Sequence, residues 1–153
     1  MVMHKKAETA LAFDFGLKQI GVAFGQTITS QAHGIKILNA KNGIPNWREI
    51  EGLIEEWDPT ILIVGLPIDM NNMESRITMA AKKFAVKLNK KFKQPVKLVD
   101  EKLSSREAKY QARETSKSVN LARVDHLAAA LILQTYLNHP ESCLLYTSDA
   151  ADE

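Results

Sequence analysis

TALAFDFGLKQIGVAF, residues 9–24, consists of two short apolar runs separated by a turn. The runs Thr9–Phe15 and Ile20–Phe24 have the length of β-strands, and the close spacing across Gly16–Lys18 suits a hairpin. Asp14 interrupts the first run, where burying a charge costs most. The stretch therefore predicts an antiparallel strand pair with an acidic residue beside its turn.

Helices and strands alternate along the rest of the chain. Apolar residues recur at helical spacing from Trp47 to Asp58-Pro59, where the pattern stops. Asn46 and Glu49 form a capping pair at the start of this helix. In order, we expect strands and helices at 34–38 (strand), 47–57 (helix), 61–64 (strand), 74–92 (helix), 96–99 (strand), 104–113 (helix) and 124–137 (helix). With the two consecutive helices at the end counted as one helical segment, the order β-β-β-α-β-α-β-α predicts an α/β fold, with a mixed sheet and helices on both faces.

Length and composition exclude several classes of protein. The 153 residues suit one compact domain, and the single Cys143 excludes a disulfide scaffold. The sequence has no apolar run of membrane-spanning length and no secretory signal at its start, so we expect a cytoplasmic protein. We assign residues 1–139 to a single domain. Residues 140–153 lack periodicity and resemble a non-native or disordered tail, so they are left out of the predicted fold.

Positive charge is concentrated in one part of the chain. The net charge is +2, but residues 82–123 hold thirteen Lys or Arg and only four acidic residues. Such a bias suits a phosphate backbone, and it equally suits a solvated lysine-rich helix face.

Three acidic residues lie where an unpaired charge would be costly. Asp14 lies in an apolar strand, Glu101 follows the end of another, and Asp125 opens an apolar helix on the face of Ala129 and Ile132. Taken singly, each could be a helix cap or a surface ion pair. Taken together, they would repel one another unless a cation neutralises them, and oxygen ligands favour Mg²⁺ or Mn²⁺.

Four motifs resemble the bacterial YqgF family of Holliday-junction-resolvase-like proteins, the pre-16S rRNA nucleases. They are LAFDFGLKQIGVAFGQ (11–26), IVGLP (63–67), VKLVDEKLSSREA (96–108) and VDHLAAALIL (124–133). The resemblance covers residues 9–138 and implies a ribonuclease H-like fold. It also implies a metal-dependent nuclease that hydrolyses phosphodiester bonds at the 5′ end of pre-16S ribosomal RNA.

The resemblance also implies the site residues. The acids of the family fall on Asp14, Glu101 and Asp125, which would be both metal ligands and catalytic residues. Three positions depart from the family pattern: Gln19 and Lys102 replace common basic residues, and His126 follows the last acid where a small or acidic residue is frequent. None of these departures removes one of the three acids.

On this interpretation, two divalent ions about 3.5–4 Å apart activate a water molecule and stabilise the leaving oxygen. Lys18 and Arg106 would contact the phosphate, and the lysines of the 74–92 helix would follow the nucleic-acid backbone, largely independently of sequence. Those lysines are Lys82, Lys83, Lys87 and Lys90. The expected partner is structured RNA, and the protein would be a monomer or a homodimer.

Other functions remain open at this point. A junction-resolving DNase would use the same acids and would need a dimer to cut two strands. A nucleic-acid-binding assembly factor with a vestigial site would have lost an acid, and all three are present. An actin-like or sugar-kinase ATPase needs two lobes, and the chain is long enough for only one.

Overall fold

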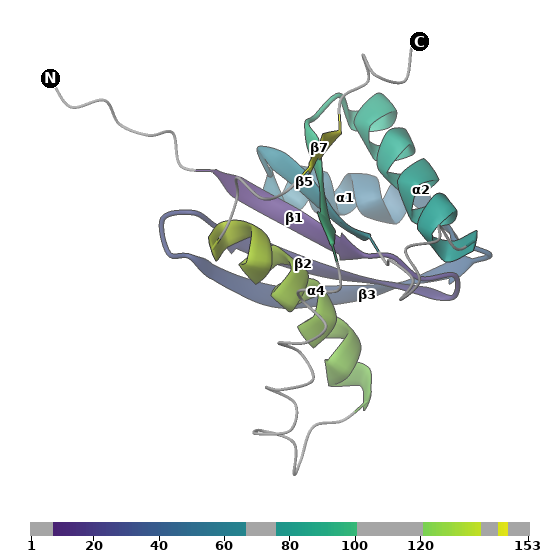
Figure 1. The fold of residues 1–153 in the computed structure, drawn as a ribbon, viewed down its shortest axis with the longest axis horizontal. Coiled ribbons are helices and arrows are strands. Elements are labelled where there is room, and N and C mark those ends of the chain that lie inside the picture. The colour runs from purple at the N-terminus through teal and green to yellow at the C-terminus, as the bar shows by residue number, and fades with distance from the viewer. Residues whose placement is uncertain (1–7, 67–75, 101–120, 139–143, 147–153) are drawn as a thin grey trace, which may run out of the picture.

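The computed structural model describes residues 8–66, 76–100, 121–138 and 144–146 (Figure 1). Their strands form one sheet in the order β4-β3-β2-β1-β5-β6-β7. The strands are β1 (Thr9–Asp14), β2 (Gln19–Gln26), β3 (Gln31–Lys41), β4 (Ile44–Pro45), β5 (Ile61–Leu66), β6 (Val96–Asp100) and β7 (Leu144–Tyr146). The helices are α1 (Trp47–Trp57), α2 (Arg76–Phe92) and α4 (Leu121–Asn138).

The sheet is mixed, as the element order predicts. β1 pairs antiparallel with β2 and parallel with β5, and β5 pairs parallel with β6. The carboxyl ends of β1, β5 and β6 therefore lie at the same edge of the sheet.

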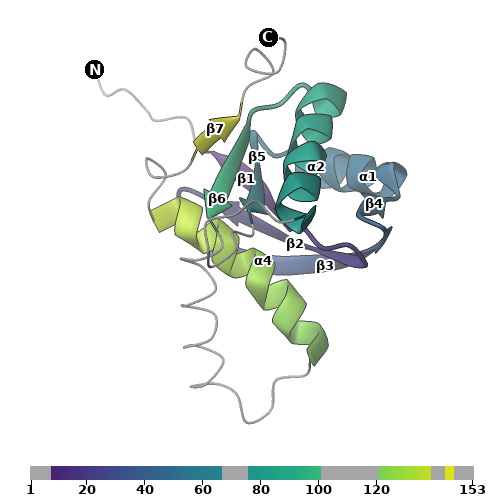
Figure 2. The same ribbon diagram turned by 45° about the vertical axis from the view of Figure 1, so that its right-hand side comes forward.

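Helices cover both faces of the sheet (Figure 2). On one face, α1 and α2 pack on large side chains, among them Leu11 and Phe13 of β1 and Leu62 and Val64 of β5. α4 crosses the other face, and its core there includes small residues such as Ala12. Because β-strand side chains alternate between faces, odd positions of β1 face α1 and α2 and even positions face α4.

α4 runs antiparallel to β1. Near its end, Gln134 Nε2 donates to the backbone oxygen of Ser30 at 2.7 Å, and the Tyr136 hydroxyl donates to Glu8 Oε1 at 3.0 Å. Ser30 lies in the β2–β3 turn and Glu8 directly precedes β1, so both mark the amino end of β1. The beginning of α4 is therefore directed toward the carboxyl end of β1.

The structure differs from the sequence prediction mainly in the length of elements. β3 covers Gln31–Lys41 rather than 34–38, and the short strands β4 and β7 were not predicted. β7 pairs with β6, although it belongs to the segment that we left out of the predicted fold. The predicted 104–113 helix lies outside the described residues. Among the described helices, none combines the length and the apolar character that crossing a bilayer requires.

Candidate functional site

Asp14 is the last residue of β1 and lies between two glycines. It pairs with Gly21 of β2 on one side and with Gly65 of β5 on the other. Side chains that are paired across neighbouring strands lie on the same face of a sheet. Because glycine has no side chain, neither of these two strand neighbours places side-chain atoms beside the half-buried Asp14 carboxylate.

Strand alternation shows on which face of the sheet the Asp14 carboxylate lies. Ala10 and Ala12, at even positions of β1, belong to the core under α4, and Ile61 and Ile63 of β5 belong to the same core. Asp14 continues the even positions of β1, as Gly65 continues the odd positions of β5. The carboxylate therefore lies on the α4 face of the sheet.

The second predicted acid follows directly after β6. The last residue of this strand, Asp100, pairs with Leu66 of β5, the residue after Gly65. The strand that leads to Glu101 thus ends at the same edge as β1. Glu101 itself lies outside the described residues.

The third predicted acid belongs to the first half of α4. The helix begins at Leu121 rather than at 124, so Asp125 does not open it and the predicted helix-cap alternative is wrong. Asp125 precedes Ala129 by one turn, and Ala129 is buried against the sheet. It also precedes Tyr136 by eleven residues, which is about 16 Å along a helix axis. Asp14 lies six residues beyond Glu8, or about 20 Å along a strand. Because the two elements run in opposite directions, the Asp125 backbone lies toward the Asp14 end; its side chain is outside the described part.

The predicted phosphate-binding residues fall into separate groups. Lys18 is exposed in the turn after β1, at the edge where Asp14 lies. The lysines of α2 lie on the opposite face of the sheet from Asp14, so the structure does not bring them together with it. Lys83, Lys87 and Lys90 are exposed and Lys82 is half-buried, whereas Arg106 lies outside the described residues.

The donor chemistry at this edge suits a hard divalent cation. The predicted ligands are all carboxylates, which are the ligands that Mg²⁺ and Mn²⁺ prefer, and the two glycines that pair with Asp14 add no competing side chain beside it. Among the side chains that the structure describes, no three Asp, Glu, His or Cys residues gather into a metal-binding group. The side chains of Glu101 and Asp125, two of the three predicted ligands, lie outside the described part of the chain.

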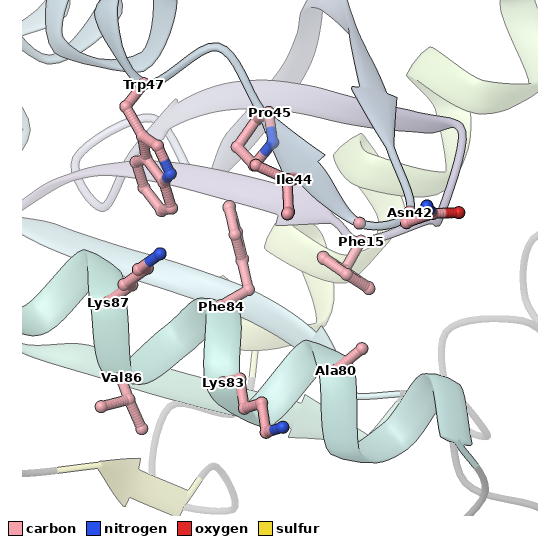
Figure 3. A pocket seen from close by; sticks show the side chains of 11 residues that line it. Phe15, Asn42, Ile44, Pro45, Trp47, Ala80, Lys83, Phe84, Val86 and Lys87 are labelled. Carbon is pink, nitrogen blue, oxygen red and sulfur yellow. The ribbon is translucent and has the colours of Figure 1, made fainter.

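Sequence reasoning missed a pocket on the α1/α2 face (Figure 3). Its cavity measures about 390 Å³, and its walls come from the residue after β1, the β3–β4 turn, the start of α1 and the middle of α2. In the sequence, Phe15, Trp47 and Phe84 have the pattern of core positions and nothing more. The lysines next to Phe84 on α2 were the available signal.

Comparisons with known proteins give a family for most of the chain. The family described as RuvX, Holliday junction resolvase, matches residues 8–139. A Coxiella burnetii protein (strain RSA 493 / Nine Mile phase I) named "Putative pre-16S rRNA nuclease" is 46% identical over 133 residues, which is 87% of this chain and 94% of the relative. A protein of the same name from Glaesserella parasuis is 46% identical over 132 residues, covering 85% of this chain and 96% of the relative.

Solved structures with this fold include Thermus thermophilus RuvC in complex with a Holliday junction substrate. It superposes with a TM-score of 0.56 at 12% identity and covers 91% of this chain and 99% of that one. At this identity the likeness concerns the fold alone. It confirms the ribonuclease H-like fold that the motifs imply.

Proposed function

The chain belongs to the RuvX family of Holliday junction resolvases, and from this premise we propose that it is a metal-dependent nuclease that processes the 5′ end of pre-16S ribosomal RNA. Nuclease activity, the hydrolysis of phosphodiester bonds, follows from the family and from the names of the relatives. The metal ions, the residues that hold them and the RNA substrate are our proposal. Such a substrate implies a cytoplasmic protein.

One observation carries the proposed site: Asp14 lies between Gly21 and Gly65 on the α4 face, at the edge where β5 and β6 also end. Lys97 and Val99 of β6 also face α4, since Val99 belongs to that core and Lys97 Nζ lies 4.9 Å from the centre of the Tyr136 ring. A strand that continued by one residue would direct Glu101 to this face as well.

The helix supplies the third ligand in this proposal. Asp125 lies seven residues before Ile132 and four before Ala129, positions that share one face of a helix. Ala129 and Ile132 are buried against the sheet, so the same face at Asp125 would look toward the carboxyl ends of the strands. Three carboxylates from β1, β6 and α4 would then surround one opening.

In this site, bound Mg²⁺ or Mn²⁺ would activate the attacking water and stabilise the leaving oxygen. Asp14, Glu101 and Asp125 would hold the ions and fix their separation. Lys18, in the turn beside Asp14, would neutralise a phosphate next to the scissile bond, and Arg106 would act from the segment after β6. Gly21 and Gly65 would let the backbone of the substrate approach the carboxylates.

Cleavage of two substrates tests the proposal. The first is a pre-16S rRNA fragment that carries the 5′ precursor sequence, and the second is a four-way DNA junction. We expect Mg²⁺-dependent cleavage of the RNA, and we expect Asp14→Asn to lower it by orders of magnitude. The control is Asp58→Asn, which changes an exposed acid at the end of α1 where the left-handed backbone (φ 47°) also accepts Asn.

The outcome decides between the substrate classes. RNA cleavage that survives Asp14→Asn, or that needs no divalent ion, would refute the proposed site. The family description favours DNA junctions as the second candidate substrate. Preferred cleavage of the junction by a dimer, with little cleavage of the RNA, would establish that second function instead.

A further inference from the structure

The pocket on the α1/α2 face combines aromatic walls with a cationic rim. Phe84 lies between two other rings: its centroid is 5.5 Å from that of Trp47, with the planes 25° apart, and 5.3 Å from that of Phe15. The cavity of about 390 Å³ is at the small end of ligand pockets, which span about 300–1,000 Å³. Its size and its walls suit one flat aromatic group.

The rim carries positive charge. Lys83 and Lys87 line the pocket, and the described lining residues include no acid. Lys87 Nζ and Lys91 Nζ lie 5.9 and 5.5 Å from the centre of the Trp47 ring. The occupant should therefore carry an anionic group next to its aromatic part.

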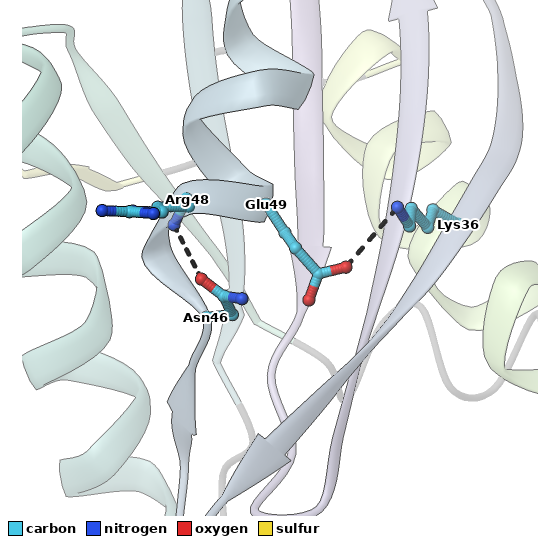
Figure 4. A network of polar contacts seen from close by, with 4 residues as sticks. All are labelled: Lys36, Asn46, Arg48 and Glu49. Atoms are coloured by element: carbon cyan, nitrogen blue, oxygen red, sulfur yellow. Dashed lines mark hydrogen bonds and ion pairs between the residues drawn. The ribbon is translucent and has the colours of Figure 1, made fainter.

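The walls of the pocket are held in place before any ligand binds. At the start of α1, Asn46 Oδ1 accepts from the backbone N–H of Arg48 at 3.0 Å, and Lys36 Nζ lies 3.5 Å from Glu49 Oε2 (Figure 4). These contacts fix the turn that carries Trp47. A rigid pocket loses less entropy when a ligand binds.

The β3–β4 turn closes the pocket above Phe15. Gly43 has φ +82°, and a Cβ at this position would lie 2.8 Å from Phe15 Cζ. Its N–H donates to the Leu17 backbone oxygen at 2.8 Å. Only glycine combines this backbone conformation with such a close approach to the ring.

From these features we propose that the pocket binds one unpaired nucleotide of a single-stranded RNA, with the base against Trp47 and Phe84 and the phosphate at Lys83 and Lys87. Base stacking on aromatic side chains, together with a basic groove, is how proteins bind single strands without reading sequence. This site lies on the opposite face of the sheet from Asp14. It would hold a flank of the substrate while another part is cleaved.

Fluorescence of Trp47 gives a direct test. The chain has two tryptophans. Trp57 packs on Phe24, with the ring centroids 4.6 Å apart, and does not line the pocket. In a Trp57→Phe protein, a mixed-sequence 12-nucleotide RNA is titrated in EDTA, so that nothing is cleaved. We expect saturable quenching by the single strand and at least several-fold weaker quenching by the same RNA annealed to its complement.

Matched variants assign the binding to the pocket. Lys87→Ala should weaken binding several-fold, whereas Lys41→Ala, which removes an exposed lysine of β3 that does not line the pocket, should leave the affinity near the parent value. Trp47→Leu, followed by anisotropy of a labelled RNA, should weaken binding by about 5- to 150-fold, the usual range for removal of one stacked base. Circular dichroism checks that each variant is folded.

Four results would overturn this proposal. They are no quenching by RNA, equal quenching by single strand and duplex, equally weakened binding in Lys87→Ala and Lys41→Ala, and a Trp47 signal that responds to protein concentration alone, which would assign the pocket to a second copy of the chain. Asp14→Asn should leave the quenching unchanged. RNA binding in the pocket and metal-dependent cleavage at Asp14 are therefore measured separately, so either proposal can be refuted without the other.

Discussion

Asp14 and Phe15 are consecutive residues, and their side chains lie on opposite faces of the sheet. Asp14 lies on the α4 face between two glycines, and Phe15 packs against Phe84 of α2 on the other face. One peptide bond therefore connects the proposed metal site with the proposed nucleotide pocket. A single strand that passes around this edge of the sheet could contact both.

Asp125→Asn tests whether Asp125 is a metal ligand. If the three carboxylates are close together, neutralising one relieves their repulsion, so the variant should be at least as stable as the parent without Mg²⁺. It should gain less stability when Mg²⁺ is added, because stabilisation by a ligand follows occupancy. Nuclease activity should fall by orders of magnitude. Thermal melts with and without Mg²⁺, together with a cleavage assay, measure all three effects.

A role outside a metal site gives a different pattern. Asp125 is the fifth residue of α4 and lies beyond its first turn, so it does not cap the helix. With no metal to hold, neutralising it would change stability and activity little. Full activity of Asp125→Asn would exclude Asp125 from the metal site.

Gly65→Val tests the space beside Asp14. The added side chain would point to the α4 face next to the carboxylate, so we expect activity to fall about 10- to 100-fold, as for other residues that support a metal site. Gly52→Ala in α1 is the control, since a Cβ there has no atom within 4 Å. It should raise the free energy of unfolding by about 0.5–1 kcal/mol and leave activity unchanged. Equal activity of both variants would show that the space is not used.

Charge reversal on α2 tests whether this helix follows the nucleic-acid backbone. Lys87→Glu with Lys90→Glu should weaken RNA binding and reduce the log–log salt slope by about 0.7–0.9 for each phosphate that the protein no longer neutralises. Both side chains are exposed, so folding should survive. The control reverses one exposed charge on β3, with Lys41→Glu, and is compared with Lys87→Glu alone. Equal slopes in these two single variants would mean that only net charge matters.

A chain that ends at residue 139 tests the assignment of the tail. We expect residues 140–153 to be dispensable, so that the melting temperature shifts by less than about 3 °C, equivalent to about 1 kcal/mol, and cleavage is unchanged. The shortened chain loses β7, which pairs with β6 through three residues. A larger shift, or aggregation through the uncovered β6, would make β7 part of the native fold.

Most of the fold could be predicted because its central elements have strong local patterns. Ile61–Leu66 is buried at every position, and Trp47–Trp57 follows the helical period that the sequence shows. β3 was harder, since only Leu38 of its eleven residues is fully buried and its alternation is irregular. β4, with two residues, is too short to carry any period.

Asp14 and the pocket on the α1/α2 face also differ in whether the sequence alone could predict them. Asp14 could be predicted because a carboxylate within an apolar run is conspicuous by itself. The pocket could not, because Phe15, Trp47 and Phe84 come from three elements, and each one alone resembles an ordinary core residue. Only the packing of α2 against the start of α1 brings the rings together.

In the proposed site, α4 also determines when the protein can become active. Its contact from Tyr136 to Glu8 joins residues 128 positions apart, so the helix reaches β1 only after nearly all of the chain has been synthesised. A ribosome adds about 5–20 residues per second, and the parts made first wait for those made last. Until then, the alanine-rich face of the sheet has no cover and Asp14 lacks the helix that carries Asp125. The proposed nuclease would thus remain inactive until α4 has been synthesised and has packed on the sheet.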